Sequence, residues 1–274
     1  MLKQNQRLCV WSGPVGVLFW LVGFALFAHF VPPPPPTQDP GAVAALYESN
    51  RNGIRVGMLL STFGAALFMP YFAVFSVQLS RIEGRFAPLA WTQLGLAAAT
   101  VLGFILPMIF IQVAAFRAGR AASEIQLFND MGWIWFISYV SVGVVQWLVI
   151  GLAILRDRRA EPLLPRWSGY LCLWTALLFA PGCLCVFFKT GPLAWDGLFT
   201  WWIPASVFSL WMAGMTPVLL KAIAAQPDVE PEGSGTSTDT GAALAEVRAE
   251  TAALRAELAA LREQVALGTG HASH

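Results

Sequence analysis

Charged residues are scarce in this chain of 274 residues: Asp, Glu, Lys and Arg together make up 12%, whereas 57% of the residues are hydrophobic. Six stretches of at least 22 residues carry no charge at all, namely 8–31, 57–80, 89–116, 131–155, 167–188 and 197–220. About 20 apolar residues suffice to cross a bilayer as a helix. The composition therefore excludes an ordinary soluble domain. It predicts an all-α membrane domain over residues 1–225, with six transmembrane helices at about 11–31, 55–79, 88–116, 131–155, 167–188 and 195–222.

Motifs for metal or cofactor chemistry are also missing. Of the three histidines, only His29 lies in or beside a predicted span, which excludes multi-histidine iron sites and bis-histidine haem ligation within one subunit. The chain has no HExxH zinc motif, no GxxxxGKS/T phosphate loop and no paired-Asp motif for a magnesium–pyrophosphate site. The four cysteines lack the spacing of a zinc site: Cys9, Cys172, Cys183 and Cys185. We therefore expect no catalytic residue, no metal and no cofactor.

Residues that couple transport to ions are scarce as well. A carboxylate in the middle of the membrane usually marks proton or cation coupling, but Asp130 and Asp196 lie at the outer ends of predicted helices. No arginine-rich voltage sensor, selectivity filter or convincing internal repeat is visible. A lipid-modifying enzyme would have to combine these acids with other outer-loop residues, such as Arg117, Arg120 and Glu124, and is the least favoured alternative.

The distribution of basic residues predicts the orientation. With the N-terminus in the cytoplasm, nine Lys or Arg residues near helix ends fall inside and five fall outside, and the cluster at 156–159 leads the inner set. Both termini are then cytoplasmic. Residues 228–274 hold eight acids and three arginines, which leaves 14 basic and 8 acidic residues for the membrane domain. This mildly basic domain suits anionic membrane lipids as partners, and we expect no nucleic-acid binding.

The first outer loop opens with five prolines, 32–36, which are expected to form an extended polyproline II spacer. Asp39 and Pro40 have the residue types of an N-cap and a first helical position, so a short helix should follow and end before Gly53. An ordered external cap is the simpler interpretation. A docking surface for an external partner is the alternative.

Small residues four apart recur on three predicted helices. Such residues let helix backbones approach closely in lipid, where packing replaces the hydrophobic driving force. Packing within one subunit is the simpler interpretation, and a subunit interface is the alternative. The three predicted helix-packing stripes are Gly57, Ser61 and Ala65; Gly95, Ala99 and Gly103; and Ala205, Ser209 and Ala213.

Polar and tryptophan side chains also occur deep within the predicted spans. Their ordinary roles are interhelical hydrogen bonds and packing, and the alternative is to line a passage for a weakly polar or apolar molecule. The candidates for such a passage are Gln93, Gln112, Gln146, Trp147, Trp174 and Trp211. Prolines should kink or locally break the helices, which in one interpretation frames a cavity: Pro70, Pro107, Pro181, Pro204 and Pro217.

The composition changes after the last predicted span. Residues 226–241 are rich in Pro, Gly, Ser, Thr and acids, which predicts a flexible linker. Residues 242–267 carry an a/d seam of about three heptads whose g and e charges suit a parallel coiled coil, and 268–274 form a disordered end. Because GSG precedes these heptads, the tail also resembles an engineered appendage. The predicted oligomerisation residues are Leu244, Val247, Thr251, Leu254, Leu258, Leu261, Val265, Glu250, Arg255, Glu257 and Arg262.

Several segments resemble a family of bacterial multi-pass membrane proteins with no assigned activity. These are FVPPPPP, LYESNRNGIRVGM, QLSRIEGR, LPRWSGYLCLW and FFKTGPLAWDGLF. The resemblance covers about residues 10–222 and leaves out the tail. It implies a location in the bacterial cytoplasmic membrane, but no activity, cofactor or site.

These observations favour a non-enzymatic, homo-oligomeric membrane protein. It would be a transport or pore-type subunit, or the membrane subunit of a larger complex, handling an apolar or lipid-like molecule. The alternative is a membrane scaffold whose coiled coil recruits a cytoplasmic partner.

Overall fold

The computed structural model describes residues 2–227 and 245–255, which contain helices and no strand. The chain divides into two compact units, Met1–Gln226 and Pro227–His274. Most of the predicted linker and the disordered end lie outside the described residues. So do six of the predicted oligomerisation residues: Leu244, Glu257, Leu258, Leu261, Arg262 and Val265.

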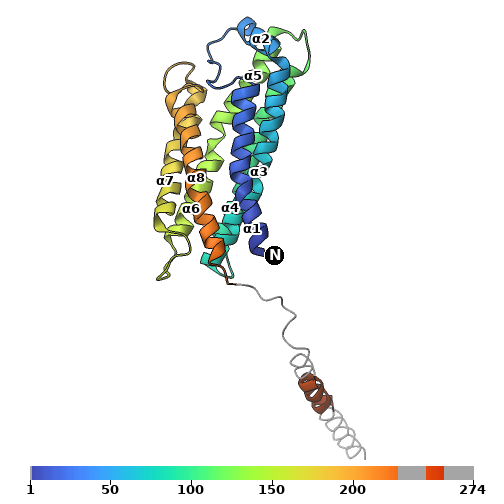
Figure 1. Cartoon of the computed structure of the whole chain (residues 1–274), viewed down its shortest axis with the longest axis vertical. Coiled ribbons are helices and arrows are strands. Elements are labelled where there is room, and N and C mark those ends of the chain that lie inside the picture. Colours follow the sequence, from blue (N-terminus) through green and yellow to red (C-terminus); the bar gives the residue numbers. More distant parts are fainter. Residues whose placement is uncertain (1, 228–244, 256–274) are drawn as a thin grey trace, which may run out of the picture. The chain divides into compact units, whose positions relative to one another are not determined.

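The first unit is an upright bundle of helices (Figure 1). Six of its helices, some of them built from two consecutive elements, are long and apolar enough to cross a membrane: Lys3–Phe27, Arg51–Glu83, Pro88–Phe116, Ala122–Leu155, Arg166–Phe187 and Leu198–Ala224. The elements are α1 (Leu2–Leu21), η1 (Val22–Phe27), α2 (Pro40–Ser49), α3 (Arg51–Glu83), α4 (Pro88–Phe116), α5 (Ala122–Ser138), α6 (Val140–Leu155), α7 (Arg166–Phe179), η2 (Ala180–Phe187), η3 (Leu198–Trp202) and α8 (Ile203–Ala224). The start of α1 and the end of α8 lie at one end of the bundle, which we call the terminal end, and α2 lies at the other, the capped end.

The helices differ from the charge-free runs at their ends. Charged residues such as Lys3, Arg51 and Glu83 are included in the helices, because a long side chain at a helix end can reach the interface. The fourth helix begins at Ala122, nine residues before its predicted start, and its added turns contact α2. The first runs from Lys3 to Phe27 instead of from about residue 11 to residue 31. His29 follows with a left-handed φ of 56°.

The first membrane helix, α1 with η1, and α3 approach closely through glycine. A Cβ atom at Gly57 would lie 2.3 Å from the carbonyl oxygen of Gly23, and one at Gly64 would lie 2.6 Å from that of Gly16. No side chain fits at such distances, so glycine is required at these positions for the two backbones to touch. Ser61 and Ala65, of the same predicted stripe, are fully buried on α3.

Glutamine side chains join the helices at the terminal end. Gln6 of α1 accepts hydrogen bonds from Gln78 of α3 at 3.0 Å and from Gln226, just after α8, at 2.8 Å. Arg81 donates to Gln78 at 2.7 Å and to the carbonyl oxygen of Ala222 at 3.3 Å. Polar side chains therefore connect the start of α1, the end of α3 and the end of α8.

The capped end is closed by an ordered segment. Helix α2 begins as predicted, with the Asp39 carboxylate accepting a hydrogen bond from the backbone N–H of Ala42 at 3.0 Å. The polyproline run is packed rather than projecting, because Pro33 and Pro34 are buried and Trp195 donates to the carbonyl oxygen of Pro34 at 2.8 Å. These contacts favour the ordered cap over the docking surface.

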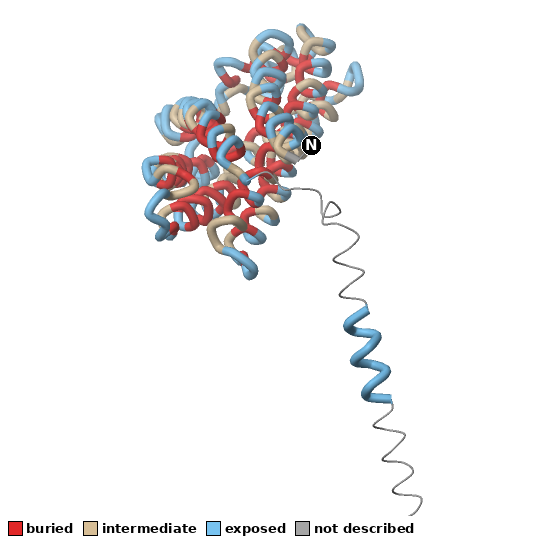
Figure 2. Tube along the Cα trace, turned by 60° about the horizontal axis from the view of Figure 1, so that its bottom comes forward, coloured by how far each residue is buried: buried red, intermediate tan, exposed pale blue. Residues whose placement is uncertain are grey.

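The described part of the second unit is a helix over residues 245–255 with every residue exposed (Figure 2). Val247 and Leu254 of the predicted seam are 62% and 58% exposed. Thr251 donates to the carbonyl oxygen of Val247 at 2.6 Å, and Glu250 and Arg255 lie on the same helix. The described part of the seam is thus helical, and its side chains are exposed.

Candidate binding cavity

Two clusters of buried side chains form the core of the bundle. One, toward the terminal end, includes Phe68, Tyr71, Phe75 and Trp211, and we call its part of the bundle the terminal half. The other includes aromatic side chains at the capped end, and we call its part the capped half: Phe24, Phe30, Tyr47, Trp133, Trp195 and Trp201. The helices change character between the two halves, so their boundary is where a site is to be sought.

Four of the six membrane helices lose regular α-helical geometry in the capped half. The first passes into the π-helical η1, the fifth into the 3₁₀-helical η2, and the sixth begins with the π-helical η3. The fourth is interrupted at Tyr139, between α5 and α6. Pro181 accounts for the change into η2, because proline has no N–H to donate. π-Helical turns occur frequently at functional sites.

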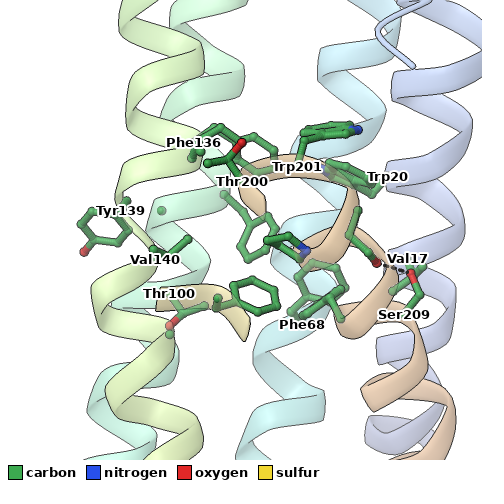
Figure 3. A pocket seen from close by; sticks show the side chains of 18 of the residues that line it. Val17, Trp20, Phe68, Thr100, Phe136, Tyr139, Val140, Thr200, Trp201 and Ser209 are labelled. Carbon is green, nitrogen blue, oxygen red and sulfur yellow. Dashed lines mark hydrogen bonds between the residues drawn. The ribbon is translucent and has the colours of Figure 1, made fainter. Parts of the chain in front are cut away.

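A cavity of about 120 Å³ lies between the two halves (Figure 3). Its wall includes Tyr139 and Thr200 of two of the interruptions, and Leu21 and Phe179, which directly precede η1 and η2. The remaining wall includes Phe68, Phe104, Phe136, Trp147, Trp20 and Trp201. Tyr139 and Ser209 lie on opposite sides of the space in Figure 3, so the cavity extends across the bundle.

The wall of this cavity is mostly apolar, and the hydroxyl groups of its two threonines and one serine are already hydrogen-bonded. The indole N–H groups of Trp20 and Trp147 are buried without a hydrogen-bond partner among the described residues. Thr100 donates to the Gln146 side-chain oxygen at 2.7 Å, and Ser209 donates to the carbonyl oxygen of Ala205 at 2.9 Å. Thr200 donates to the carbonyl oxygen of Ala194. No lysine, arginine, aspartate or glutamate contributes to the wall. Such a surface suits an uncharged, apolar occupant.

A second hollow of about 400 Å³ lies on the outside of α4 and α5, and we call it the lateral groove. Its residues are Phe110, Leu127, Asp130, Met131, Ile134, Trp135, Ser138 and Tyr139. Leu127, Met131 and Ile134 are exposed on the surface of the bundle. Tyr139 belongs to both the groove and the central cavity. The two spaces therefore adjoin at this residue.

Tyr139 is held by an aromatic partner and a glycine. Its ring stacks on Trp135, with centroids 5.6 Å apart and an interplanar angle of 19°. On the α4 side, a Cβ atom at Gly103 would lie 2.3 Å from the ring. The predicted packing residue Gly103 therefore makes room for a side chain and not for a neighbouring helix backbone.

The other predicted stripe residues have different surroundings. Nothing lies within 4 Å of a Cβ atom at Gly95, which is exposed like a lipid-facing residue, and Ala99 is half-buried beside it. On α8, Ala205 and Ser209 line the cavity, and Ser209 and Ala213 are both exposed. Among the three stripes, the one with Gly57 makes close helix–helix contacts in this unit.

The six candidate passage residues are dispersed. Trp147 lines the cavity, and Gln146 holds the cavity residue Thr100. Gln93 bonds to Ser76 and to the carbonyl oxygen of Phe72. The remaining three lie away from the cavity wall: Gln112 is half-buried, Trp174 is 60% exposed, and Trp211 is fully buried and donates to the Cys172 sulfur at 3.3 Å.

The outer-loop residues considered for an enzyme do not converge on one site. Arg117 and Arg120 lie over the rings of Phe116 and Phe128, and Glu124 is exposed. Burial raises the pKa of Asp196 above its usual value, without a neighbouring acid or base as a cause. Within the described ranges, no group of three His, Cys, Asp or Glu side chains is placed to hold a metal ion.

Sequence analysis named neither Tyr139 nor any phenylalanine of the cavity. These residues differ in no recognisable way from other aromatic residues of the spans, and Ser138 and Ser141 beside Tyr139 are the only polar signal.

Comparisons of the chain with family models, with curated proteins and with solved structures find no match.

Proposed function

We propose that this protein binds an apolar molecule of the membrane in the central cavity, as a transport-type subunit or the membrane subunit of a larger complex. The observation that carries the proposal is the position of the cavity. It lies where four of six membrane helices abandon regular geometry, although uninterrupted helices would satisfy their backbone groups in lipid more simply.

The size and chemistry of the cavity support an apolar occupant of limited size. An engineered apolar cavity of about 150 Å³ binds benzene, so about 120 Å³ accommodates a group close to that size. The cavity reaches Tyr139 and, through it, the lateral groove on the surface of α4 and α5. The molecule would therefore exchange with the bilayer from the side of the bundle.

Fluorine NMR with fluorobenzene tests this proposal on the full chain in lipid nanodiscs. We expect a saturable bound signal that is separate from the signal of probe dissolved in lipid. Ala205→Phe places a ring in the cavity and should abolish the bound signal. Ala213→Phe is the matched control, because it adds the same ring to an exposed position two turns further along α8. A bound signal that survives Ala205→Phe, or none in the native protein, would overturn the proposal.

A second role, in assembly, is supported by the exposed seam of the tail. Val247 and Leu254 are one heptad apart and both largely exposed on a helix, and apolar residues repeating in this way associate with a partner helix. The proposal is that the tail gathers copies of the chain in parallel. A scaffold in which the same seam recruits a different cytoplasmic protein is the alternative.

Size-exclusion chromatography with light scattering separates these interpretations. Deleting residues 238–274 should lower the oligomeric state in mild detergent and leave the thermal unfolding of the membrane unit unchanged. Replacement of Val247 and Leu254 by Asp should act like the deletion. A monomeric full-length protein would contradict self-assembly, and unfolding of the membrane unit upon deletion would contradict the independence of the tail.

A further inference from the structure

We infer that the lateral groove is a binding site for a long-chain amphiphile whose head group donates hydrogen bonds to Asp130. The groove combines an apolar floor with one carboxylate. Its floor consists of Phe110, Met131, Ile134, Trp135 and Tyr139, and Asp130 is its charged group. This arrangement matches a molecule that has one apolar chain and one polar end.

The size of the groove indicates what it can accommodate. At about 400 Å³ it falls within the range of roughly 300–1,000 Å³ of small-molecule sites. It is therefore large enough for a chain, whereas the central cavity admits a small group. The groove is also open on the surface of the bundle, where Leu127, Met131 and Ile134 are exposed.

Asp130 is oriented from the capped end. Tyr47 of α2 donates to the side-chain oxygen of Asn129 at 3.1 Å, and the amide of Asn129 donates to Oδ1 of Asp130 at 3.3 Å. Burial of Tyr47, with a smaller effect of the Asp130 charge, raises the pKa of the phenol far above its usual value, so that it remains a donor. Within the described part of the chain, Oδ2 of Asp130 accepts no hydrogen bond.

The charges near the groove favour a neutral donor over a cation or an anion as the head group. A carboxylate accepts hydrogen bonds and donates none, so an anionic head would be repelled and an ether head would leave Oδ2 unpaired. Lys189 is exposed and close enough to stabilise the Asp130 charge, which weakens the attraction for a second cation. A long-chain alcohol meets these conditions.

The position of Tyr139 suggests a second step after binding, and this step rests on the proposed function of the cavity. The chain of an amphiphile held at Asp130 would extend along α5 toward Tyr139, about two and a half turns away, whose ring also borders the cavity. Rotation of that ring off Trp135 would join the two spaces. Binding in the groove does not require this rotation, so the two proposals can fail separately.

Photolabelling of the full chain in phosphatidylcholine nanodiscs tests the groove. The probes are dodecanol, its methyl ether and dodecanoate, each with a diazirine near the end of the chain. We expect saturable labelling of the peptide that carries Met131 and Trp135. Dodecanol should reach half-saturation at about a threefold to tenfold lower concentration than its ether, as one hydrogen bond contributes, and dodecanoate should bind most weakly.

Variants separate the carboxylate from the general charge of the surface. Asp130→Asn should remove the preference for the alcohol over the ether. Glu124→Gln is the matched control, because it removes the same charge from an exposed position on the same helix and should leave the preference intact. Equal binding of all three probes, tighter binding of dodecanoate, or an equal effect of both variants would overturn the inference. Ala205→Phe should leave groove labelling unchanged, which distinguishes failure of the groove from failure of the cavity.

Discussion

The terminal and capped halves of the bundle differ in the geometry of their helices. In the terminal half the helices are regular, and α3 and α8 continue as α-helices through Pro70 and Pro217. In the capped half, η1, η2 and η3 replace α-helical turns, and each contributes a side chain to the aromatic cluster: Phe24, Cys185 and Trp201. The regular half and the irregular half therefore form different sides of the cavity, with Phe68 on one and Trp201 on the other.

The two ends of the bundle are also held together by different kinds of contact. The terminal end is joined by side chains of its helices, with Gln6 bonding to both Gln78 and Gln226. The capped end is joined through loops and the short helix α2, as in the bonds of Trp195 to Pro34 and of Tyr47 to Asn129. Loops open at lower free energy than packed helices, so we expect motion around the cavity to involve the capped half.

The largest predicted effect concerns the core of the terminal half. Trp211 is fully buried and its ring stacks on Phe75, with centroids 5.4 Å apart. Trp211→Ala should lower the free energy of unfolding by about 3–5 kcal/mol, because it leaves a large cavity. Unfolding in bicelles would measure this loss. Trp174→Ala, at a site 60% exposed, should cost about 0.5 kcal/mol or less; similar losses for both would contradict the assignment of the core.

An intermediate effect is expected where η1 of the capped half meets α3. Gly57→Ala would place a methyl group 2.3 Å from a backbone oxygen of Gly23, and the resulting separation of the helices should cost about 1–3 kcal/mol. Gly95→Ala is the matched control, because its Cβ atom would meet nothing within 4 Å. It should stabilise the helix by about 0.5–1 kcal/mol, the helix-propensity difference. Both variants are measured by the same unfolding assay. Equal effects on the unfolding free energy would contradict the claim that Gly57, and not Gly95, packs against a neighbouring backbone.

The smallest effect concerns the pH dependence of the capped end. Burial raises the pKa of Tyr47 in the folded protein, so above pH ~10 the unfolded chain loses this proton first. The unfolding free energy should then fall by up to about 1.4 kcal/mol per pH unit. Tyr47→Phe should remove this slope and lose about 0.5–1.5 kcal/mol at neutral pH with the bond to Asn129. An unchanged slope in the variant, measured as stability between pH 8 and 11, would show that other groups cause it.

The membrane helices were predictable because their signal is local. Absence of charge over 22 or more residues located all six helices, and the fourth was missed only at its start, where Ala122–Asp130 carries Glu124 and several polar residues but packs on α2. Asp39 identified the start of α2, because an N-cap requires only its own neighbouring N–H groups.

The breaks and the stripes were not predictable in this way. Prolines at 70, 107 and 217 lie within continuous α-helices, whereas η1 contains no proline at all. Three stripes of the same pattern have three surroundings: Gly57 touches a helix backbone, Gly95 faces open space, and Ala205 lines a cavity. The four-residue spacing places the small residues on one side of their helix. Whether that side contacts a helix backbone, a cavity or the surroundings of the bundle depends on how the neighbouring helices are placed.

The sequence by itself determined that this chain forms six apolar helices, a capping helix after Asp39 and a tail of different composition, because each property depends on residues close together in the chain. Only the tertiary structure decided that Tyr139, Trp147 and Ser209 surround one space and that Asp130 and Tyr139 share a groove. Tyr139, Trp147 and Ser209 come from different elements, and Asp130 and Tyr139 are separated by nine positions along the fourth helix. Their proximity follows from how whole helices pack, and no local pattern encodes that packing.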